Sequence, residues 1–596
     1  MEKAESSLEI SRHSLAHIMA TAVLKLYPDT KFGIGPTIEN GFYYDFEFTD
    51  PLTPEKLPKI EKEMRRILKD NFKFEKRVVS ADEARKIFSE QPYKIELVDD
   101  LASEGETEMG IYTSGDFTDL CRGPHMDSSA DLRKLAFKLE KLAGAYWRGD
   151  EKRPMLTRIY ALAFETQAEL DEHLAMLEEA KKRDHRKLGK ELDLFSFHEE
   201  APGMPFWHDK GLTIFNLLAE RWRKIQKRHG YIEVKCPIFL DVKLWKQSGH
   251  YDHYKDGMFF IKTENKEMAL RPMDCPGAIL MYQETMHSYN DLPLRVSELG
   301  TVYRKEQAGE LHGLLRVQSI TQDDAHIFIA EEQIENEVTE VLQIMQEIYE
   351  PFGLKTQVFL ATRPDDSMGD LETWAKAEEA LKHALASNKI EYQMAEKDGA
   401  FYGPKIDIKI KDSLGRIWQT GTIQLDFFMP EKFGLKYIAE DGKEHQPVMI
   451  HRALMGSLER FIGILIEHYA GNFPAWLAPV QIKILSVSEK HREFCRALYH
   501  EISAAGLRAE LDLSNETVGK KIRNATMEKV PYILVIGDKE VAGGDFCLKV
   551  RGSEEMVSLN KQDLVGRIRE EGRAGQEGQV GREELVEKVG EETFNK

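Results

Sequence analysis

A length of 596 residues predicts several domains, roughly three or four at the usual domain size. The hydrophobic share of 42% is enough for packed cores and excludes a disordered chain. The net charge of −20 argues against non-specific nucleic-acid binding, although it is compatible with a local basic groove. The five cysteines are far apart and odd in number, which indicates a reducing compartment. Without a leader or a bilayer-long apolar run, we expect a soluble, cytoplasmic protein with no membrane contact.

The N-terminal segment predicts a helix with two histidines on one face, because His13 and His17 are four residues apart in a helical apolar pattern. The alternating aromatic run at 35–48 predicts a strand. Residues 54–70 predict an amphipathic helix, and residues 132–142 predict another.

Cys121 and His125 flank a Gly-Pro loop, and with His13 and His17 they form two close pairs of potential ligands. Such pairs are typical of tetrahedral zinc. The same side chains would also suit a hydrolytic pocket that positions water and an ester. A third interpretation is two ordinary helix histidines and an unrelated buried cysteine. Spacing alone does not choose between zinc and hydrolysis.

The rest of the chain predicts two further folded regions. A long polar helix over 164–194 leads into a region where many strands are flanked by helices, which indicates an α+β domain. Within it, residues 303–328 predict an antiparallel hairpin with a Gly-containing loop at 308–310. After Pro479, strands and helices alternate, which predicts a small α/β domain with a largely parallel sheet and a loop at Gly537–Glu540.

Three signals resemble motifs 1, 2 and 3 of the class II aminoacyl-tRNA synthetases. They are a strand ending at Pro237, the hairpin with Arg304 and Glu306, and Gly-Ser-Leu-Glu-Arg at the helix start 456–460. Longer segments resemble the threonyl-tRNA synthetase family: RPMDCPG (271–277), TQDDAHIF (321–328), AFYGPKI (400–406) and HRALMGSLERFIG (451–463). HSLAH, GFYYD and CRGPH resemble the editing domain of that family, and the resemblance covers about 12–569.

The resemblance implies a multidomain α+β protein whose catalytic core is the antiparallel sheet of class II synthetases. The implied domains are an α+β editing domain at 1–163, a helical linker at 164–194, the catalytic domain at 195–477 and an α/β anticodon-binding domain at 478–572. The Gly-, Glu- and Arg-rich composition predicts a disordered tail at 573–596.

The implied activity is ligation of L-threonine to the 3′ end of tRNA(Thr) with ATP, together with hydrolysis of mischarged Ser-tRNA(Thr). The implied cofactors are one zinc ion per subunit and Mg²⁺ with ATP, and motif 1 implies a homodimer. The implied metal ligands are Cys275, His326 and His451, which leave one position open for threonine. The implied threonine-binding residues are Gln322, Asp324 and Tyr402.

The implied ATP-binding residues are Arg304, Glu306, Arg316, Gln419, Gln424 and Arg460. Arg304 and Arg460 are the implied catalytic cations, and His250 is the residue implied to assist transfer to tRNA. The implied editing residues are His13, His17, Cys121, His125, Tyr44, Lys94 and Asp119, and we favour water activation over a metal there. The candidates for anticodon recognition are Asn515, Glu540, Lys549 and Arg551.

Two features depart from the family pattern. Family members commonly begin with a small ubiquitin-like domain, whereas this sequence starts at the editing domain. Ile320 stands where many members carry an aromatic residue that stacks on adenine. Two other hypotheses are a catalytically inactive RNA-binding relative, which loss of Arg304, Arg460 or a zinc ligand would support, and a free-standing hydrolase of mischarged tRNA, which needs no ATP site.

Overall fold

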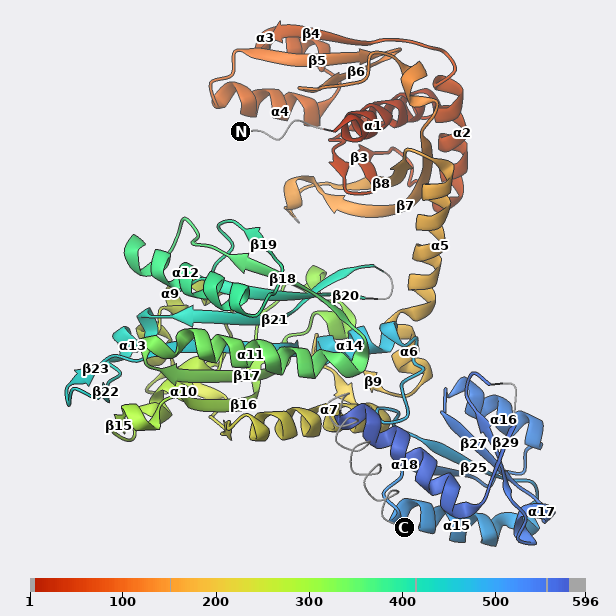
Figure 1. Ribbon diagram of the computed structural model, residues 1–596. Coiled ribbons are helices and arrows are strands. Elements are labelled where there is room, and N and C mark those ends of the chain that lie inside the picture. Colours follow the sequence, from red (N-terminus) through yellow and green to blue (C-terminus); the bar gives the residue numbers. More distant parts are fainter. Residues whose placement is uncertain (1–5, 151, 413–414, 554–555, 578–596) are drawn as a thin grey trace. The chain divides into compact units, whose positions relative to one another are not determined.

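The computed structural model describes residues 6–150, 152–412, 415–553 and 556–577. The chain divides into two compact units, Met1–Glu178 and Glu179–Lys596 (Figure 1). Within the described residues, no helix has the length and apolar character needed to cross a membrane.

The first unit is built around the buried helix α1 (Ser7–Leu26), whose start is closed by a capping box between Ser6 and Glu9. Its two sheets have the orders β1-β3-β8-β7, with β2 paired to β3, and β4-β5-β6. The strands are β1 (Lys31–Phe32), β2 (Thr37–Ile38), β3 (Gly41–Glu47), β4 (Phe74–Ser80), β5 (Glu108–Ser114), β6 (Phe117–Leu120), β7 (Ala136–Tyr146) and β8 (Met155–Phe164). The other helices are α2 (Leu57–Ile67), α3 (Ala81–Ile87) and α4 (Pro92–Ser103).

The prediction of a helix over 132–142 is wrong. Residues 136–146 form β7, which pairs antiparallel with β8. Phe137 and Leu139 are buried, whereas Lys138 and Glu140 are exposed, so the segment alternates with the period of a strand. The apolar residues fit both periods, and the partner strand decides between them.

The prediction of one helix over 164–194 is also wrong, because the segment contains α5 (Gln167–Arg183) and α6 (His185–Glu191). Asp184 separates them with a non-helical backbone, φ −47° and ψ 118°. Its side chain accepts a hydrogen bond from the backbone N–H of Arg186 and so caps α6.

The core of the second unit is an eight-stranded sheet in the order β11-β16-β17-β24-β21-β20-β18-β19, antiparallel except at its two outermost pairs. Its strands are β11 (Ile232–Glu233), β16 (Leu294–Tyr303), β17 (Ser319–Ile329), β18 (Lys355–Ala361), β19 (Tyr392–Ala395), β20 (Lys405–Lys411), β21 (Ile417–Asp426) and β24 (Val448–Ser457). The predicted hairpin is β16–β17, but its strands end at Tyr303 and begin again at Ser319, so the connection is longer than the predicted turn.

Helices α7 (Asp209–Arg228), α11 (Ile334–Tyr349), α12 (Leu371–Ser387) and α14 (Leu458–His468) share one apolar core with this sheet (Figure 1). Alternate residues of the strands enter that core, for example Ile406, Ile408 and Ile410 of β20. The polar residues between them therefore face the other side of the sheet.

Smaller elements surround the sheet. They are β9 (Phe195–Ser196), β10 (Phe206–Trp207), β12 (Phe239–Asp241), β13 (Phe260–Lys262), β14 (Glu267–Leu270), β15 (His287–Ser288), β22 (Tyr437–Ile438), β23 (Glu444–His445), α8 (Val242–Gln247), α9 (His250–Tyr254), α10 (Cys275–Tyr282) and α13 (Phe428–Phe433).

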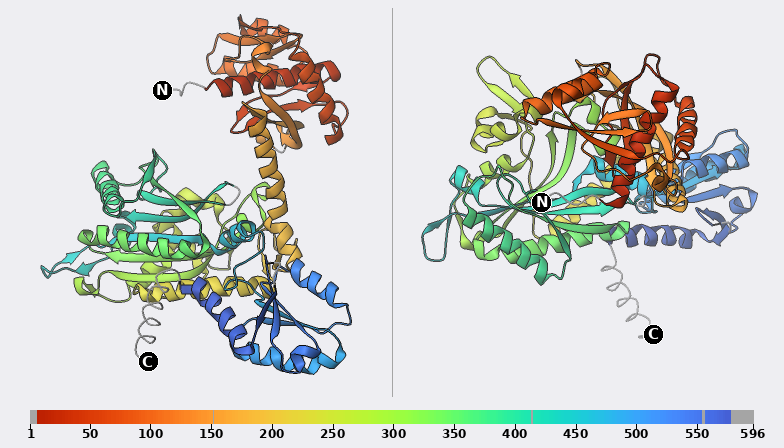
Figure 2. Two further views of the ribbon diagram at one scale, coloured as in Figure 1. Left: turned by 45° about the vertical axis from the view of Figure 1, so that its right-hand side comes forward. Right: turned by 90° about the horizontal axis from the view of Figure 1, so that it is seen from above.

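The C-terminal sheet has the order β26-β25-β27-β28-β29, and Figure 2 shows it with its helices in blue. Its elements are β25 (Ile482–Ser486), α15 (Arg492–Ala504), β26 (Ala509–Asp512), α16 (Val518–Met527), β27 (Tyr532–Ile536), α17 (Asp538–Val541), β28 (Phe546–Val550), β29 (Met556–Leu559) and α18 (Lys561–Glu577). Strand β25 pairs parallel with both neighbours, whereas β28 and β29 are antiparallel, so the sheet is mixed.

Two predictions for the C-terminal region need correction. The expected loop at Gly537–Glu540 contains the short helix α17. The expected disordered tail begins too early, because residues 573–577 belong to α18. Residues 578–596 lie outside the described residues.

Candidate functional site

The polar face of the central sheet borders a cavity of about 300 Å³. On β17, Gln322, Asp324 and His326 line it, whereas Ala325 and Ile327 enter the core. The lining residues are Met273, Cys275, Arg304, Gln322, Asp324, His326, Tyr402, Lys405, Gln419, Thr422, Gln424, His451, Arg452 and Ala453. The structure thus brings together nine residues that sequence reasoning named, from six segments of the chain.

The three expected metal ligands all line this cavity. Cys275 begins α10, and His326 of β17 is the register partner of His451 on β24. Their ligand atoms lie within 4.8 Å of one another, and all three side chains are buried. Nε2 of His326 is buried without a hydrogen-bond partner among the described residues. Burial and, next, Asp324 raise the pKa of the Cys275 thiol well above its ordinary value, so a thiolate here requires a cation. These observations fit a zinc ion.

Asp426 is a residue that sequence reasoning missed. It is fully buried, and its Oδ2 lies 2.9 Å from Nε2 of His451. Its Oδ1 accepts the backbone N–H groups of Phe428 and Met429 at the start of α13. An Asp at the end of a strand and before a helix is a capping signal, but the contact with His451 requires the fold.

The side chains expected to bind the amino acid share this cavity with the three expected metal ligands. The hydroxyl of Tyr402 donates to Oε1 of Gln424 at 2.6 Å. The pairing of β17 with β24 shifts between Gln322 and Asp324, and the intervening Asp323 points away from the cavity. Its carboxylate accepts backbone N–H groups of residues 454–456, and therefore holds the end of β24 in place.

Two arginines, Arg304 and Arg452, line the cavity, and Arg460 lies next to Gln419, which also lines it. Arg304 lines the cavity, and its Nε donates to the Pro272 carbonyl at 3.3 Å. Arg460 donates from Nε to the Leu315 carbonyl at 2.9 Å and from Nη1 to the Gln419 carbonyl at 3.3 Å.

The start of α14 sets the position of Arg460. Gly456 has φ +73°, and a Cβ there would lie 2.2 Å from the Thr420 carbonyl oxygen, so a side chain is excluded. Ser457 then caps α14 by accepting the backbone N–H of Arg460 at 3.2 Å. The Gly-Ser-Leu-Glu-Arg segment is therefore a strand end and a helix start.

Four expected residues are not among those lining the cavity. Glu306 and Arg316 lie in the β16–β17 connection and pair with each other at 2.9 Å. Arg460 donates to the backbone carbonyl of Gln419, which does line the cavity. His250 is fully buried, with Nδ1 2.8 Å from Ser248 Oγ and Nε2 2.9 Å from Met273 Sδ. Burial, with nearby cationic groups, lowers the pKa of His250 to about 3, so its imidazole is neutral.

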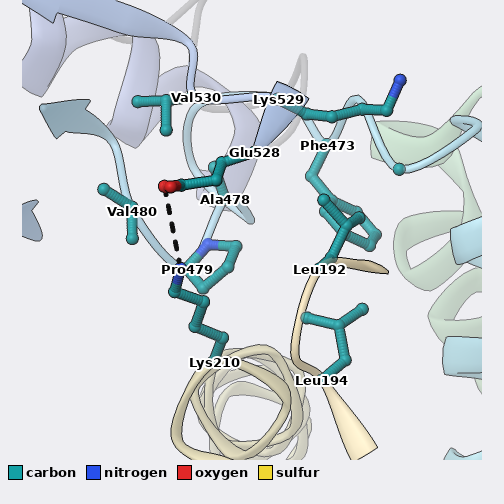
Figure 3. A pocket seen from close by; sticks show the side chains of 11 residues that line it. Leu192, Leu194, Lys210, Phe473, Ala478, Pro479, Val480, Glu528, Lys529 and Val530 are labelled. Atoms are coloured by element: carbon teal, nitrogen blue, oxygen red, sulfur yellow. Dashed lines mark ion pairs between the residues drawn. The ribbon is translucent and has the colours of Figure 1, made fainter. Parts of the chain in front are cut away.

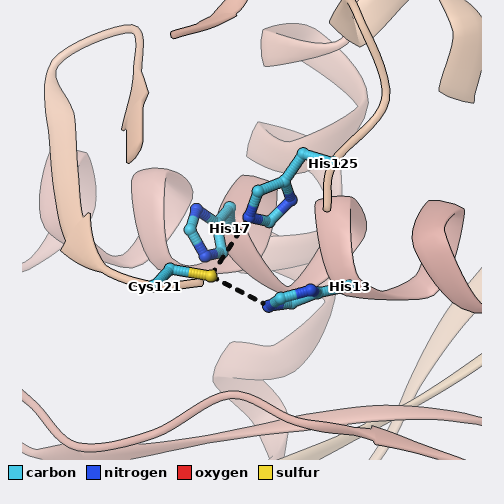
Figure 4. A group of neighbouring side chains, drawn as sticks. All are labelled: His13, His17, Cys121 and His125. Carbon is cyan, nitrogen blue, oxygen red and sulfur yellow. Dashed lines mark hydrogen bonds between the residues drawn. The ribbon is translucent and has the colours of Figure 1, made fainter. Parts of the chain in front are cut away.

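The first unit brings its four Cys and His side chains together beside the middle of α1 (Figure 4). Cys121 Sγ lies 3.3 Å from His13 Nε2 and 3.4 Å from His125 Nε2. The backbone N–H of Gly123 donates to the same sulfur at 3.3 Å. Ser14 Oγ lies 3.1 Å from His125 Nδ1 and accepts the backbone N–H of Met126.

Tyr44, Lys94 and Asp119 form a buried layer beside this cluster. The Tyr44 hydroxyl donates to Asp119 Oδ2 at 2.6 Å, and Lys94 Nζ lies 3.2 Å from the Tyr44 oxygen and pairs with Asp119. His17 Nε2 lies 3.6 Å from Asp119 Oδ2 and thereby joins the two layers. All seven residues expected in an editing pocket are therefore neighbours.

Burial keeps the imidazoles of His17 and His125 and the thiol of Cys121 uncharged near pH 7. Burial, then His17 and His13, lowers the pKa of His125 to about 2. Burial also lowers the pKa of His17 well below its ordinary value. Burial and, next, Asp119 raise the pKa of the Cys121 thiol to about 12. Neutral imidazoles can accept a proton from water, and the same imidazoles with a thiolate can also ligate a metal.

The four anticodon candidates have different surroundings. Asn515 accepts a hydrogen bond from Arg492, and Glu540 accepts the backbone N–H of Gly537 at 2.8 Å. Lys549 lies half-buried on β28. Arg551 instead donates to the carbonyls of Lys529, Asn472 and Phe473. These bonds give Arg551 a structural role at the start of the C-terminal domain.

A small cavity of about 20 Å³ lies where the residues around Pro479 meet α7 (Figure 3). Leu192, Leu194 and Phe473 supply apolar walls, and Lys210 pairs with Glu528 at 3.9 Å. This volume suits a single water molecule and no substrate.

The central sheet is mainly antiparallel, and its cavity is lined by arginines and by potential metal ligands. Together with the sequence motifs, this architecture is that of a class II aminoacyl-tRNA synthetase. Residues 259–469 match the tRNA synthetase class II core domain (G, H, P, S and T), residues 478–571 match the anticodon binding domain, and residues 109–160 match the threonyl and alanyl tRNA synthetase second additional domain. The chain belongs to the threonine–tRNA ligase family.

Two relatives and one solved structure illustrate this membership. A threonine–tRNA ligase of Acetivibrio thermocellus is 51% identical over 95% of this chain and 88% of its own length. A threonine–tRNA ligase of Clostridium tetani is 49% identical over the same shares of both chains. The crystal structure of the RNA binding domain of threonyl-tRNA synthetase from Cryptosporidium parvum superposes with a TM-score of 0.64, at 40% identity, over 65% of this chain and 98% of that one.

Proposed function

We propose that this ligase activates threonine in the 300 Å³ cavity of the second unit and hydrolyses seryl-tRNA in the Cys/His pocket of the first. The observation that carries the first part is the convergence of Cys275, His326 and His451 with Arg304 in one cavity. The intact set argues against an inactive RNA-binding relative, and the cavity argues against a free-standing hydrolase.

Cys275, His326 and His451 would hold the zinc ion, with Asp426 orienting His451. Zinc with three protein ligands supplies a Lewis-acidic position that can bind an amino group and a hydroxyl. Asp324 accepts a hydrogen bond from the threonine hydroxyl. Gln322 and Tyr402 contact the remaining polar atoms of the amino acid.

This arrangement explains why a second site is needed. Valine lacks the hydroxyl, would leave Asp324 unpaired, and can be rejected by roughly 10⁴ or more. Serine keeps the hydroxyl and lacks only one methyl group, which is worth roughly 1–3 kcal/mol. Serine therefore reaches tRNA at a rate that requires hydrolysis afterwards.

In activation, a threonine carboxylate oxygen forms a bond to the α-phosphorus of ATP, and the bond to the pyrophosphate oxygen breaks. Negative charge grows on the phosphoryl oxygens, and Mg²⁺ accompanies ATP. Arg304 contacts the α-phosphate and Arg316 the terminal phosphate, while Arg460 contacts the adenine face and the γ-phosphate. Glu306, Gln419 and Gln424 complete the ATP site, and His250 assists transfer to tRNA from behind Met273.

In editing, water attacks the ester carbonyl carbon and the ribose hydroxyl leaves. The neutral imidazole of His125 is suited to take the proton from water, with His13 beside it, while Lys94, Tyr44 and Asp119 hold the ester. Metal binding by the same four Cys and His residues is the alternative. Metal analysis of purified protein before and after chelation, compared with its seryl-tRNA hydrolysis, distinguishes the two.

Homodimerisation and the domain boundaries are further parts of the proposal. Strand β11 lies at the edge of the central sheet, and its Ile232 is 56% exposed, which supports a partner at this edge. The domains are residues 1–163, 164–194, 195–477 and 478–572, and the last binds the anticodon loop of tRNA(Thr). Sedimentation at micromolar concentration tests the dimer.

The decisive experiment is threonine-dependent exchange of pyrophosphate into ATP by the purified protein. We expect exchange with threonine, little with serine and none with valine. If zinc-loaded protein shows no threonine-dependent exchange, the proposed function is wrong.

A further inference from the structure

His185 is buried, and neither the proposed activation of threonine nor the proposed editing reaction involves it. It is the first residue of α6 and is 0% exposed. It lies between helix α14 and the short helical turn Gly313–Leu315 within the β16–β17 connection, and these three elements contact one another. His185 is therefore placed between the motif 2 loop and the motif 3 helix.

Both ring nitrogens of His185 are engaged. Nδ1 lies 2.7 Å from Oε1 of Glu467 on α14, and a carboxylate oxygen can only accept. Nε2 lies 3.0 Å from the backbone N of Leu314, which can only donate. The contacts thus select the neutral imidazole with its proton on Nδ1. In that form His185 connects Glu467 to the backbone of the loop.

Both neighbours of His185 are built for this contact. Gly313 has φ +50°, and a Cβ there would lie 2.2 Å from His185 Nε2, so only glycine lets the loop approach this closely. Glu467 also accepts the backbone N–H of His185 at 3.1 Å and pairs with Arg416. The carboxylate is thereby held from two sides, which makes it a rigid support for the imidazole.

The loop held by His185 carries ATP-site groups. Leu315 follows Leu314 directly, and its carbonyl accepts Nε of Arg460 at 2.9 Å. Arg316 comes next and pairs with Glu306 at 2.9 Å. A shift of the Leu314 backbone would therefore displace both arginines.

We infer that His185 is a positioning residue for ATP: through the Leu314 N–H it fixes the loop that orients Arg316 and Arg460. This inference rests on the proposed function, because those arginines are ATP ligands only in that proposal. His185 touches no substrate. Its loss leaves a buried N–H unpaired and the loop free to move.

Two substitutions distinguish the two hydrogen bonds that the His185 imidazole makes, to Glu467 and to Leu314. In His185→Gln the amide oxygen can occupy the place of Nε2 and accept from Leu314. In His185→Asn the amide nitrogen can occupy the place of Nδ1 and donate to Glu467, but nothing reaches Leu314. We expect H185N to raise the KM for ATP in pyrophosphate exchange about tenfold. We expect H185Q to stay within about twofold of the original chain. The KM for threonine should be unchanged in both.

Hydrogen exchange at the Leu314 amide gives a second readout, expected to be faster in H185N and slow in H185Q. If H185N fails to fold, Gly313→Ala tests the same contact from the loop side and should raise the KM for ATP. An unchanged KM for ATP in H185N would overturn the inference. Equal increases of the KM for ATP in H185N and H185Q would overturn it as well. If the wild-type protein shows no threonine-dependent pyrophosphate exchange, the proposed function is wrong instead.

Discussion

Nε2 of His451 donates to Oδ2 of Asp426 across 2.9 Å, which leaves Nδ1 as the nitrogen with a free lone pair. The other carboxylate oxygen of Asp426 is held by two backbone N–H groups of α13. Asp426 therefore decides both the tautomer and the orientation of a proposed zinc ligand, as carboxylates behind metal-bound histidines generally do.

Asp426→Asn should weaken zinc binding about 10–100-fold. The asparagine oxygen can still cap α13, but the amide nitrogen cannot accept from Nε2, so the proton moves to Nδ1 and blocks the ligand position. Competition with a chelator, followed by metal analysis, measures the dissociation constant without reference to activity. Asp441→Asn, at an exposed carboxylate of the same unit, is the control. An unchanged dissociation constant in D426N would contradict this role.

The Lys94–Tyr44–Asp119 layer predicts a variant that separates editing from charging. Removing Lys94 alone would leave Asp119 buried without its cation, which would lower the stability of the fold by several kcal/mol. The paired change Lys94→Met and Asp119→Asn removes both charges together. We expect hydrolysis of Ser-tRNA to fall by about 100-fold or more, with threonine-dependent exchange unchanged. Lys76→Met, at an exposed lysine bonded to the Arg122 carbonyl, should leave hydrolysis intact. If the paired variant hydrolyses Ser-tRNA at the normal rate, the editing site does not lie in this pocket.

The depressed pKa of His125 predicts the pH dependence of editing. With a pKa of about 2, His125 is neutral throughout pH 6–8, and burial lowers the pKa of His17 in the same direction. A lowered histidine pKa favours the neutral base at lower pH than usual, so no loss of base is expected on acidification to pH 6. The rate of Ser-tRNA hydrolysis, corrected for the uncatalysed reaction, should be flat over this range. A fall with an apparent pKa near 6.5 would show that an ordinary histidine limits the reaction.

Sequence reasoning recovers features that depend on local periodicity. KIDIKI at 405–410 alternates strictly, and the structure has strand β20 there, with Ile406 and Ile408 in the core and Lys405 at the cavity. Residues 132–142 show the limit of the same method. Their apolar spacing suits a helix equally well, and pairing with β8 makes them a strand.

Side chains that act through distant partners cannot be found this way. Asp426 and His451 are 25 residues apart, and His185 and Glu467 are 282 residues apart. In the sequence, His185 is one member of a charged run that is typical of a solvated face. Burial and two directional hydrogen bonds, which only the fold supplies, distinguish it from its neighbours. Family resemblance alone points to Lys94, because no spacing in the sequence connects it to Asp119.

Ile320 predicts a gain of ATP affinity by substitution. It is partly exposed on β17, opposite Val302 of β16 and close to the β16–β17 connection that carries Arg316. An aromatic ring at this position can stack on adenine, and stacking on a base is worth roughly 1–3 kcal/mol relative to alanine. Isoleucine already supplies part of that contact, so Ile320→Phe should lower the KM for ATP about threefold to tenfold. Ile320→Ala should raise it. Both are measured by pyrophosphate exchange at saturating threonine. Ile417→Phe, at an exposed position of the same sheet, should have no effect. An unchanged or higher KM for ATP in I320F would show that adenine does not pack on this side chain.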